Sequence, residues 1–174
     1  MGKALGNHTN RLWKMRNGYA LPSAGGLKEV TARLQSMSET ELDAIREKLQ
    51  IGVQRDTQVT LKGGRHLVTQ VYCSALPVAY SGLASPLWEP FARLVLEAAY
   101  EATLAVALLN VANSGNKTVY LTLLGGGAFG NDQTWILDAI CRSVTIYKQM
   151  GLEVKIVSFR HSNPAVRKLC EDVS

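Results

Sequence analysis

The stretch Val119-Tyr-Leu-Thr-Leu-Leu-Gly-Gly-Gly-Ala-Phe-Gly-Asn131 decides the fold of this chain. Its first half is rich in β-branched, aromatic and apolar residues, which is typical of a buried strand, and three consecutive glycines then end it. Apolar residues from about Gln133 to Met150 predict a long helix directly after the loop. We therefore expect a strand, a glycine loop and a helix in immediate succession.

A loop of this kind is suited to binding an anion. Glycines place little bulk over the backbone N–H groups, and the following helix directs the positive end of its dipole at the same point. The sequence therefore predicts a phosphate or diphosphate site at the loop. The alternative is a tight strand–helix turn that needs glycine only for its φ angles. The flanking strand and helix, together with Phe129-Gly130-Asn131, favour phosphate binding.

Strands and helices alternate along the rest of the second half. Strands are predicted at 67–72, 119–124 and 153–159, and helices at 88–112, 133–150 and 163–171. This order predicts an α/β layer sandwich with a mainly parallel or mixed sheet and right-handed crossovers. Before it, two helices are expected at 27–35 and 38–50, the second starting with a capping box from Ser38 to Glu41. Residues 1–25 show no periodicity and are expected to form an irregular arm ahead of a domain at 26–174.

Composition places the chain among soluble globular proteins. It has 174 residues, of which 47% are hydrophobic and 19% charged, which is enough for one domain with a real core. No run of about 18 apolar residues predicts a membrane span, and the N-terminus lacks a signal core. The three cysteines have no metal-ligand spacing, so we expect a reduced, cytoplasmic protein without a metal or a cofactor.

The net charge of +5 is concentrated at one end of the chain. Residues 1–65 carry 11 Lys and Arg against 6 Asp and Glu, whereas residues 66–174 carry 8 of each. Attraction to a polyanion is one interpretation, and an ordinary solvated surface is the other. We favour the solvated surface, and do not expect a nucleic-acid partner, because no nucleic-acid-binding motif accompanies the charge.

Two common phosphate-binding motifs can be compared with the loop. The P-loop is excluded, because Asn131-Asp132 stand where its Lys and Ser/Thr are required. The dinucleotide fingerprint does match, as Gly125-x-Gly127-x-x-Gly130. No acidic residue ends the next strand, although Ser158, Arg160 and His161 there could meet an NADP 2′-phosphate. The fingerprint normally opens its domain, so an NADP-binding oxidoreductase fragment is retained as the alternative.

The block from Val119 to Phe159 resembles the final third of macrodomains, which bind ADP-ribose. The matching parts are the apolar strand, the glycine loop, the helix and the closing strand. The run Gly-Ala-Phe-Gly also looks like the corresponding loop of poly(ADP-ribose) glycohydrolases. Residues 68–80 are similar to the preceding strand of the family, and residues 97–104 to its following helix. The resemblance covers about residues 50–160 and implies a three-layer α/β/α sandwich.

The resemblance implies a role for each matched residue. Amides from Gly126 to Gly130 would hold a diphosphate, and Phe129 would pack against a ribose or serve as a core aromatic. Asn131 could bond a ribose hydroxyl, although we favour a capping role for it. The residues expected to contact ADP-ribose are Gly125, Gly126, Gly127, Ala128, Phe129, Gly130, Asn131, Ser74, Tyr80 and Phe159.

The family's early strand, with its Asn-Ala-Ala-Asn-like segment and glycine loop, has no match here. Residues 7–10 and 25–26 are poor substitutes. Either the chain enters the domain partway through, or the arm completes the sheet in another way. An unfinished sheet edge would invite self-association or a partner chain. Hydrolysis of ADP-ribosyl conjugates stays open, with no catalytic residue assigned. Glu97 and Glu101 share a helix face, which is suited to acid–base chemistry, but we favour a solvated stripe.

Overall fold

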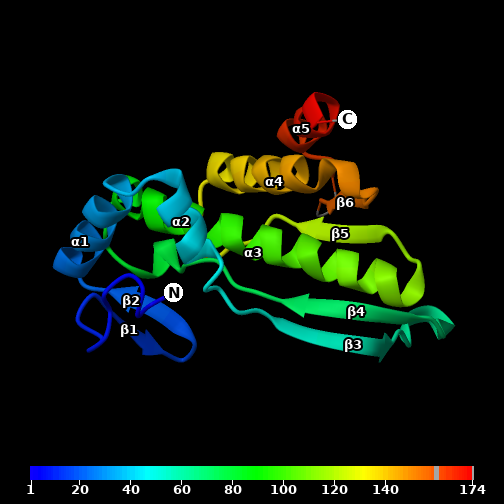
Figure 1. Ribbon diagram of the computed structural model, residues 1–174, viewed down its shortest axis with the longest axis horizontal. Helices are drawn as coiled ribbons and strands as arrows, with labels where there is room; N and C mark the ends of the chain where they lie inside the picture. Colours follow the sequence, from blue (N-terminus) through cyan, green and yellow to red (C-terminus); the bar gives the residue numbers. More distant parts are fainter. Residues whose placement is uncertain (159–160, 174) are drawn as a thin grey trace.

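The computed structural model describes residues 1–158 and 161–173. The chain is mixed α/β and is arranged around one long helix, α3 (Ser85–Ser114). This helix contacts three other helices, α1 (Ala24–Gln35), α2 (Glu39–Arg46) and α4 (Gln133–Tyr147), and two strands, β4 (Leu67–Tyr72) and β5 (Thr118–Thr122) (Figure 1). Trp88, Phe91 and Leu96 of α3 are at most 2% exposed and form the centre of the core. The helix ends at Gly115, whose left-handed φ of 73° is typical of a helix C-terminus.

The central helix is also long and apolar enough to cross a membrane, judged by length and composition alone. Core helices of soluble proteins meet the same criterion, and α3 is packed on several sides by other elements. The sequence-based expectation that the chain spans no membrane therefore stays a prediction.

The predicted succession of strand, loop, helix and strand is present. Strand β5 (Thr118–Thr122) leads to the loop and to α4, and β6 (Glu153–Val157) returns beside β5. The two strands pair in parallel, from Thr118 opposite Glu153 to Thr122 opposite Val157. Between them α4 ends in a short 3₁₀ turn (Lys148–Met150) and a left-handed glycine, Gly151, which is the expected terminator. The last helix, α5 (Pro164–Val173), packs on α4.

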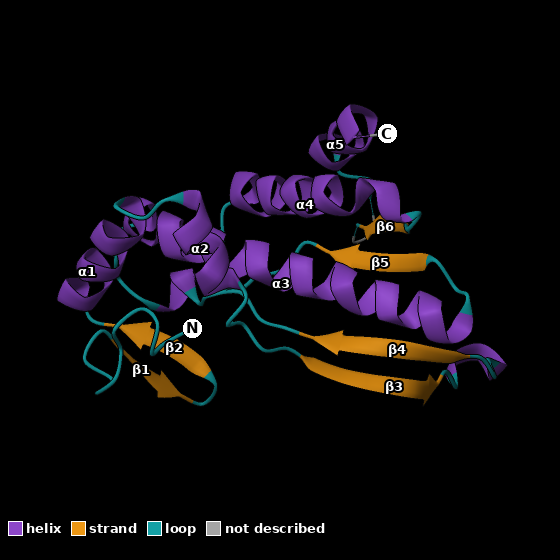
Figure 2. Cartoon of the chain, in the orientation of Figure 1, coloured by secondary structure: helices purple, strands orange, loops and turns teal. Residues whose placement is uncertain are grey.

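The strands do not form one sheet within the described residues, so the three-layer sandwich is not confirmed. They form three two-stranded sheets (Figure 2). Strands β3 (Gly52–Gln58) and β4 (Leu67–Tyr72) make an antiparallel pair on one side of α3, and the β5–β6 pair lies on another. The strand pairs keep exposed apolar side chains, including Val53, Leu67, Tyr72, Tyr120 and Val157.

Residues 1–25 are structured, although the sequence predicts an irregular arm. They contain a hairpin of β1 (Trp13–Arg16) and β2 (Tyr19–Pro22), and α1 begins at Ala24. Asn17 and Gly18 have φ angles of 50° and 83°, as a type I′ turn requires, and Asn-Gly is its usual sequence. Leu5, Leu12 and Trp13 are buried in the same core as α3. The strands are only four residues long, which is too short for a period of two to be evident.

The first two helices follow their capping signals. Ser23 accepts a hydrogen bond from the Gly26 amide and starts α1. Ser38 and Glu41 form the predicted capping box at the start of α2, but this helix ends at Arg46, earlier than expected. Gly26 lies directly against the residue that precedes β1, because a Cβ added there would stand 2.0 Å from the Leu12 carbonyl oxygen. The hairpin and α1 therefore pack as one unit.

Candidate functional site

The glycine loop is held in place at its beginning by α3. The Tyr100 hydroxyl donates to the Thr122 carbonyl at 2.8 Å and accepts from the Leu124 amide at 2.9 Å. Burial raises the pKa of Tyr100 above its ordinary value, so its neutral hydroxyl can make both bonds. These bonds fix the end of β5 at the point where the chain enters the glycines.

Inside the loop, the backbone amides divide into two groups. Gly126, Gly130 and Asn131 donate to loop carbonyls, those of Leu123, Gly127 and Gly125 respectively. The amides of Gly127, Ala128 and Phe129 donate to no protein acceptor in the described part of the chain. Of the amides from Gly126 to Gly130 expected to hold a diphosphate, those of Gly126 and Gly130 are thus used within the loop. Three consecutive donors remain on an exposed segment.

Asn131 closes the loop from within the protein. Its side chain is 5% exposed, and its amide nitrogen donates to the Leu76 carbonyl at 2.8 Å and to the Gly125 carbonyl at 3.3 Å. Its Oδ1 atom is buried and has no partner among the described residues. The expectation that Asn131 caps the helix is wrong, because Asp132 is the N-cap residue and accepts from the Thr134 amide at 2.8 Å.

The capping aspartate affects where an anion can bind. Bonds from the Thr134 hydroxyl and amide hold the pKa of Asp132 below its usual value, so the carboxylate is ionised at neutral pH. A negative charge therefore already stands at the N-terminus of α4 and complements its dipole. The donors open to a further anion are the loop amides rather than the end of the helix.

The consecutive glycines differ in their surroundings. Gly125 has a φ of 76°, and a Cβ there would stand 2.4 Å from the Ala75 Cβ atom. A Cβ at Gly126 would stand 3.1 Å from the Ile136 side chain, whereas one at Gly127 would meet nothing within 4 Å. At the far end, Gly130 has a φ of 68° and packs closely on Ala79. The loop is therefore tightly fitted at both ends and open at Gly127.

An aromatic cluster stands beside the loop. The Phe129 ring lies 5.4 Å from that of Tyr80 and 5.6 Å from that of Tyr19, centroid to centroid, and the two tyrosine rings lie 5.4 Å apart. All three contacts are edge-to-face, a favoured geometry for aromatic pairs. The Phe129 carbonyl also accepts from the Ala79 amide at 2.9 Å. Tyr19 comes from the N-terminal hairpin, and the sequence does not point to it because residues 1–25 show no periodicity.

The remaining predicted ligand contacts lie near this cluster or outside the described residues. Tyr80 is half exposed, in a 3₁₀ turn (Val78–Tyr80) that faces the loop. Ser74 is exposed, and its hydroxyl donates to the neighbouring Ala75 carbonyl at 3.1 Å. Phe159, and Arg160 of the NADP alternative, are outside the described residues. The structure thus brings the loop and the 74–80 segment together.

The two carboxylates on α3 take part in ion pairs rather than forming a solvated stripe. Glu97 binds Arg46, and Glu101 binds Arg142. The same two arginines also bind Glu39 and Asp43, which links α2, α3 and α4. This arrangement is a structural cross-link between helices, because each carboxylate already faces a guanidinium.

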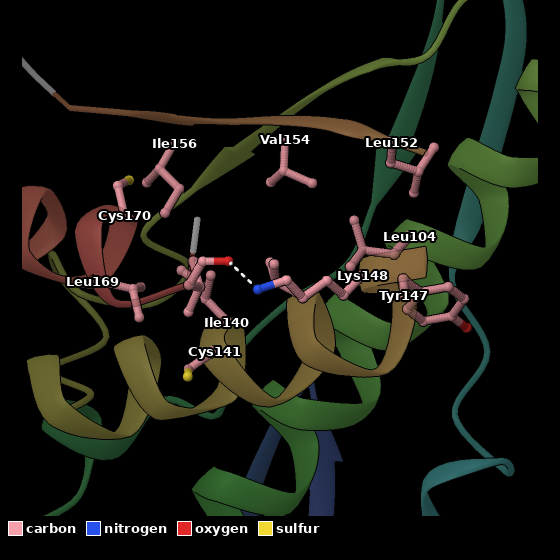
Figure 3. Close-up of a pocket in the computed structure, with 12 residues that line it drawn as sticks. Leu104, Ile140, Cys141, Tyr147, Lys148, Leu152, Val154, Ile156, Leu169 and Cys170 are labelled. Carbon is pink, nitrogen blue, oxygen red and sulfur yellow. Dashed lines mark hydrogen bonds between the residues drawn. The ribbon is translucent and has the colours of Figure 1, made fainter. Parts of the chain in front are cut away.

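Two cavities of the described structure lie away from the glycine loop. One, of about 280 Å³, lies under α5 and against β6 and α4 (Figure 3). At its rim, Lys148 Nζ donates to the Val173 carbonyl at 3.1 Å. The other, of about 270 Å³, lies between α1, α2 and α3. Neither cavity is lined by a residue of the glycine loop.

Comparisons with known proteins give no relative. No model of a protein family matches the chain, and no match was found among curated proteins or solved structures. The function therefore has to be argued from the loop and its surroundings.

Proposed function

We propose that this chain is a macrodomain-like module that binds ADP-ribose, or a related nucleotide diphosphate, at the Gly125–Asn131 loop. The observation that carries the proposal is the run of three consecutive amides, at Gly127, Ala128 and Phe129, with no acceptor in the described part of the chain. Successive main-chain donors on a glycine loop form a concave site for phosphate oxygens. Their position directly after a parallel strand and before a helix is where α/β proteins bind phosphates.

The frame around these donors supports the proposal. The loop is fixed at its start by Tyr100 and at its end by Asn131, so its open middle is held in one shape. A preorganised site loses less conformational freedom on binding than a flexible loop does. The closed packing at Gly125 and Gly130, beside open space at Gly127, also supports a site over a simple turn.

Phe129 and Tyr80 give the proposed site an apolar wall. Tyr80 is 50% exposed, and its ring packs on that of Phe129 beside the loop donors. An aromatic surface beside phosphate donors suits a ligand with a sugar next to its diphosphate. Completion of the three-layer sandwich by a partner chain is part of the same proposal, because the strand pairs have unpaired edges within the described residues.

The proposal assigns residues to ligand binding but none to catalysis. The α3 carboxylates that suited acid–base chemistry are held by Arg46 and Arg142, so neither is offered as a catalyst for ADP-ribosyl hydrolysis. Release of ADP-ribose from a modified protein is the assay for that activity.

The test is calorimetric titration of the chain with ADP-ribose, NAD and NADP. We expect ADP-ribose to bind, and Gly127→Glu to abolish the binding, because its carboxylate would stand beside the free amides and repel a diphosphate. Gly127→Ala is the matched control. It adds a methyl group in open space and leaves the amide, so it should bind within about threefold of wild type.

The outcomes separate the alternatives. Binding of NADP alone would replace the proposal with the NADP-binding oxidoreductase fragment. If none of the three ligands gives a heat of binding, a structural or interaction domain is left. Equal affinity of Gly127→Glu and wild type would place any ligand elsewhere. Circular dichroism of each variant shows whether the fold is kept.

A further inference from the structure

The loop offers hydrogen-bond donors to a diphosphate but no free positive charge of its own. The residues from Gly125 to Thr134 include one charged side chain, and it is the acid Asp132. Arg93 lies against the start of α4, but Glu89 and Asp138 hold it, each at 2.7 Å. A diphosphate bound by amides alone would remain poorly neutralised, so its binding calls for a cation that another element brings to the loop.

The N-terminal hairpin reaches the loop at its turn. Tyr19 follows the turn and packs its ring edge-to-face on Phe129 of the loop, at 5.6 Å, and on Tyr80 at 5.4 Å. The hairpin itself is firmly anchored. The buried Asn7 side chain accepts from the Leu12 amide and donates to the Trp13 carbonyl, each at 2.9 Å.

Arg16 stands directly across the hairpin from Tyr19. Residues opposite each other in an antiparallel pair project from the same face, with Cβ atoms about 5 Å apart. The side chain of Arg16 therefore leaves the hairpin on the face that meets Phe129. Arg16 is exposed, and it makes no ion pair with any residue of 1–158 or 161–173. An exposed guanidinium without a carboxylate, next to an anion-binding loop, is free to bind a phosphate.

We propose that the hairpin turn is part of the ligand site, with Arg16 pairing with the diphosphate held by the Gly127–Phe129 amides and Tyr19 positioning Phe129. This inference rests on the proposed function. A planar guanidinium can bind two phosphate oxygens at once and provides the charge that the amides lack. Arg16, one of the basic residues in excess in the N-terminal part of the chain, would then bind the ligand.

The test compares Arg16→Gln with Arg55→Gln. Arg55 is also exposed and makes no ion pair among the described residues, but it lies on β3, away from the hairpin. Both variants lose one positive charge, so long-range attraction is matched. In ADP-ribose titration we expect Arg16→Gln to weaken binding about tenfold or more, because a charge-assisted bond is lost. Arg55→Gln should stay within about twofold of wild type, and Arg16→Lys should recover part of the loss.

Salt dependence gives a second readout. Binding by wild type should weaken as salt is raised, and Arg16→Gln should show a smaller dependence than Arg55→Gln. Equal affinities of wild type and Arg16→Gln would overturn the inference and leave the proposed function standing. Equal losses in both variants would overturn it as well, since they indicate a general charge effect. No binding by wild type would overturn both.

Tyr19 is tested by the behaviour of the loop without ligand. Tyr19→Ala removes a ring that packs on Phe129, so hydrogen exchange of the hydrogen-bonded amides of Ala79, Gly130 and Asn131, which hold the loop in shape, should become about tenfold faster. Tyr19→Phe keeps the ring and should exchange like wild type. Unchanged exchange in Tyr19→Ala would show that the hairpin does not position the loop.

Discussion

At the scale of single residues, the three consecutive glycines of the loop have different surroundings. Gly125 has a left-handed φ and touches Ala75, Gly126 lies against Ile136, and Gly127 faces open space. The sequence locates all three, but it cannot distinguish them, because the contacts come from residues distant in the chain. The same limit explains why Asn131 was expected to cap the helix. Its partner, the Leu76 carbonyl, is 55 positions away.

The difference between Gly125 and Gly127 can be measured directly. Gly125→Ala places a Cβ 2.4 Å from that of Ala75 at a φ of 76°, so we expect a loss of about 3 kcal/mol in the free energy of unfolding from strain and overpacking combined. Gly127→Ala should change it by less than about 0.5 kcal/mol. Urea denaturation followed by circular dichroism is the measurement. Equal stability of the two variants would mean that Gly125 is not required by its contacts.

At the scale of elements, local signals predicted the helices well but not what joins them. The capping box of α2, the glycine end of α3 and the span of α4 all follow from short-range patterns. The ion pairs between α2, α3 and α4 do not, because Arg46 and Glu97 are 51 positions apart. Charges that look solvated along one helix can be paired once the helices pack.

The interhelical ion pairs should matter for stability where they are buried. The side chain of Arg46 is 6% exposed and that of Glu97 is 16% exposed, so Arg46→Met leaves a largely buried carboxylate without its partner. We expect the free energy of unfolding to fall by about 2 kcal/mol. This loss is smaller than for a fully buried pair because Glu39 and Asp43, which also bind Arg46, are more accessible. Arg11→Met, which breaks an exposed pair with Glu29, should leave the urea midpoint unchanged. Equal effects of the two substitutions would contradict a structural role for the buried cluster.

At the scale of the whole molecule, the order of elements was predictable and the pairing of strands was not. Periodicity identifies β4, β5 and β6 but does not say which edges meet. The family resemblance implied one sheet, whereas the described residues form local pairs placed around α3. The sequence predicts an irregular N-terminal segment because its strands are short, yet the segment provides part of the core. The Asn17-Gly18 dipeptide was the available signal for its hairpin.

Burial of Trp13 makes the N-terminal segment part of the whole fold rather than an appendage. Its ring centroid lies 5.1 Å from that of Phe91 in α3, and the residue is 7% exposed. Trp13→Ala should therefore lower the free energy of unfolding by about 3 kcal/mol, as expected for removing a large buried aromatic side chain. Met15→Ala is the control, on the same strand but at a residue that is 60% exposed, and it should lower the free energy of unfolding by less than about 0.5 kcal/mol.

Because the hairpin, α1 and α3 share one core, we also expect one cooperative transition in both variants. A separate early transition of the hairpin, or a loss in Trp13→Ala no larger than in Met15→Ala, would show that the segment folds apart from the core and cannot hold Arg16 and Tyr19 at the loop.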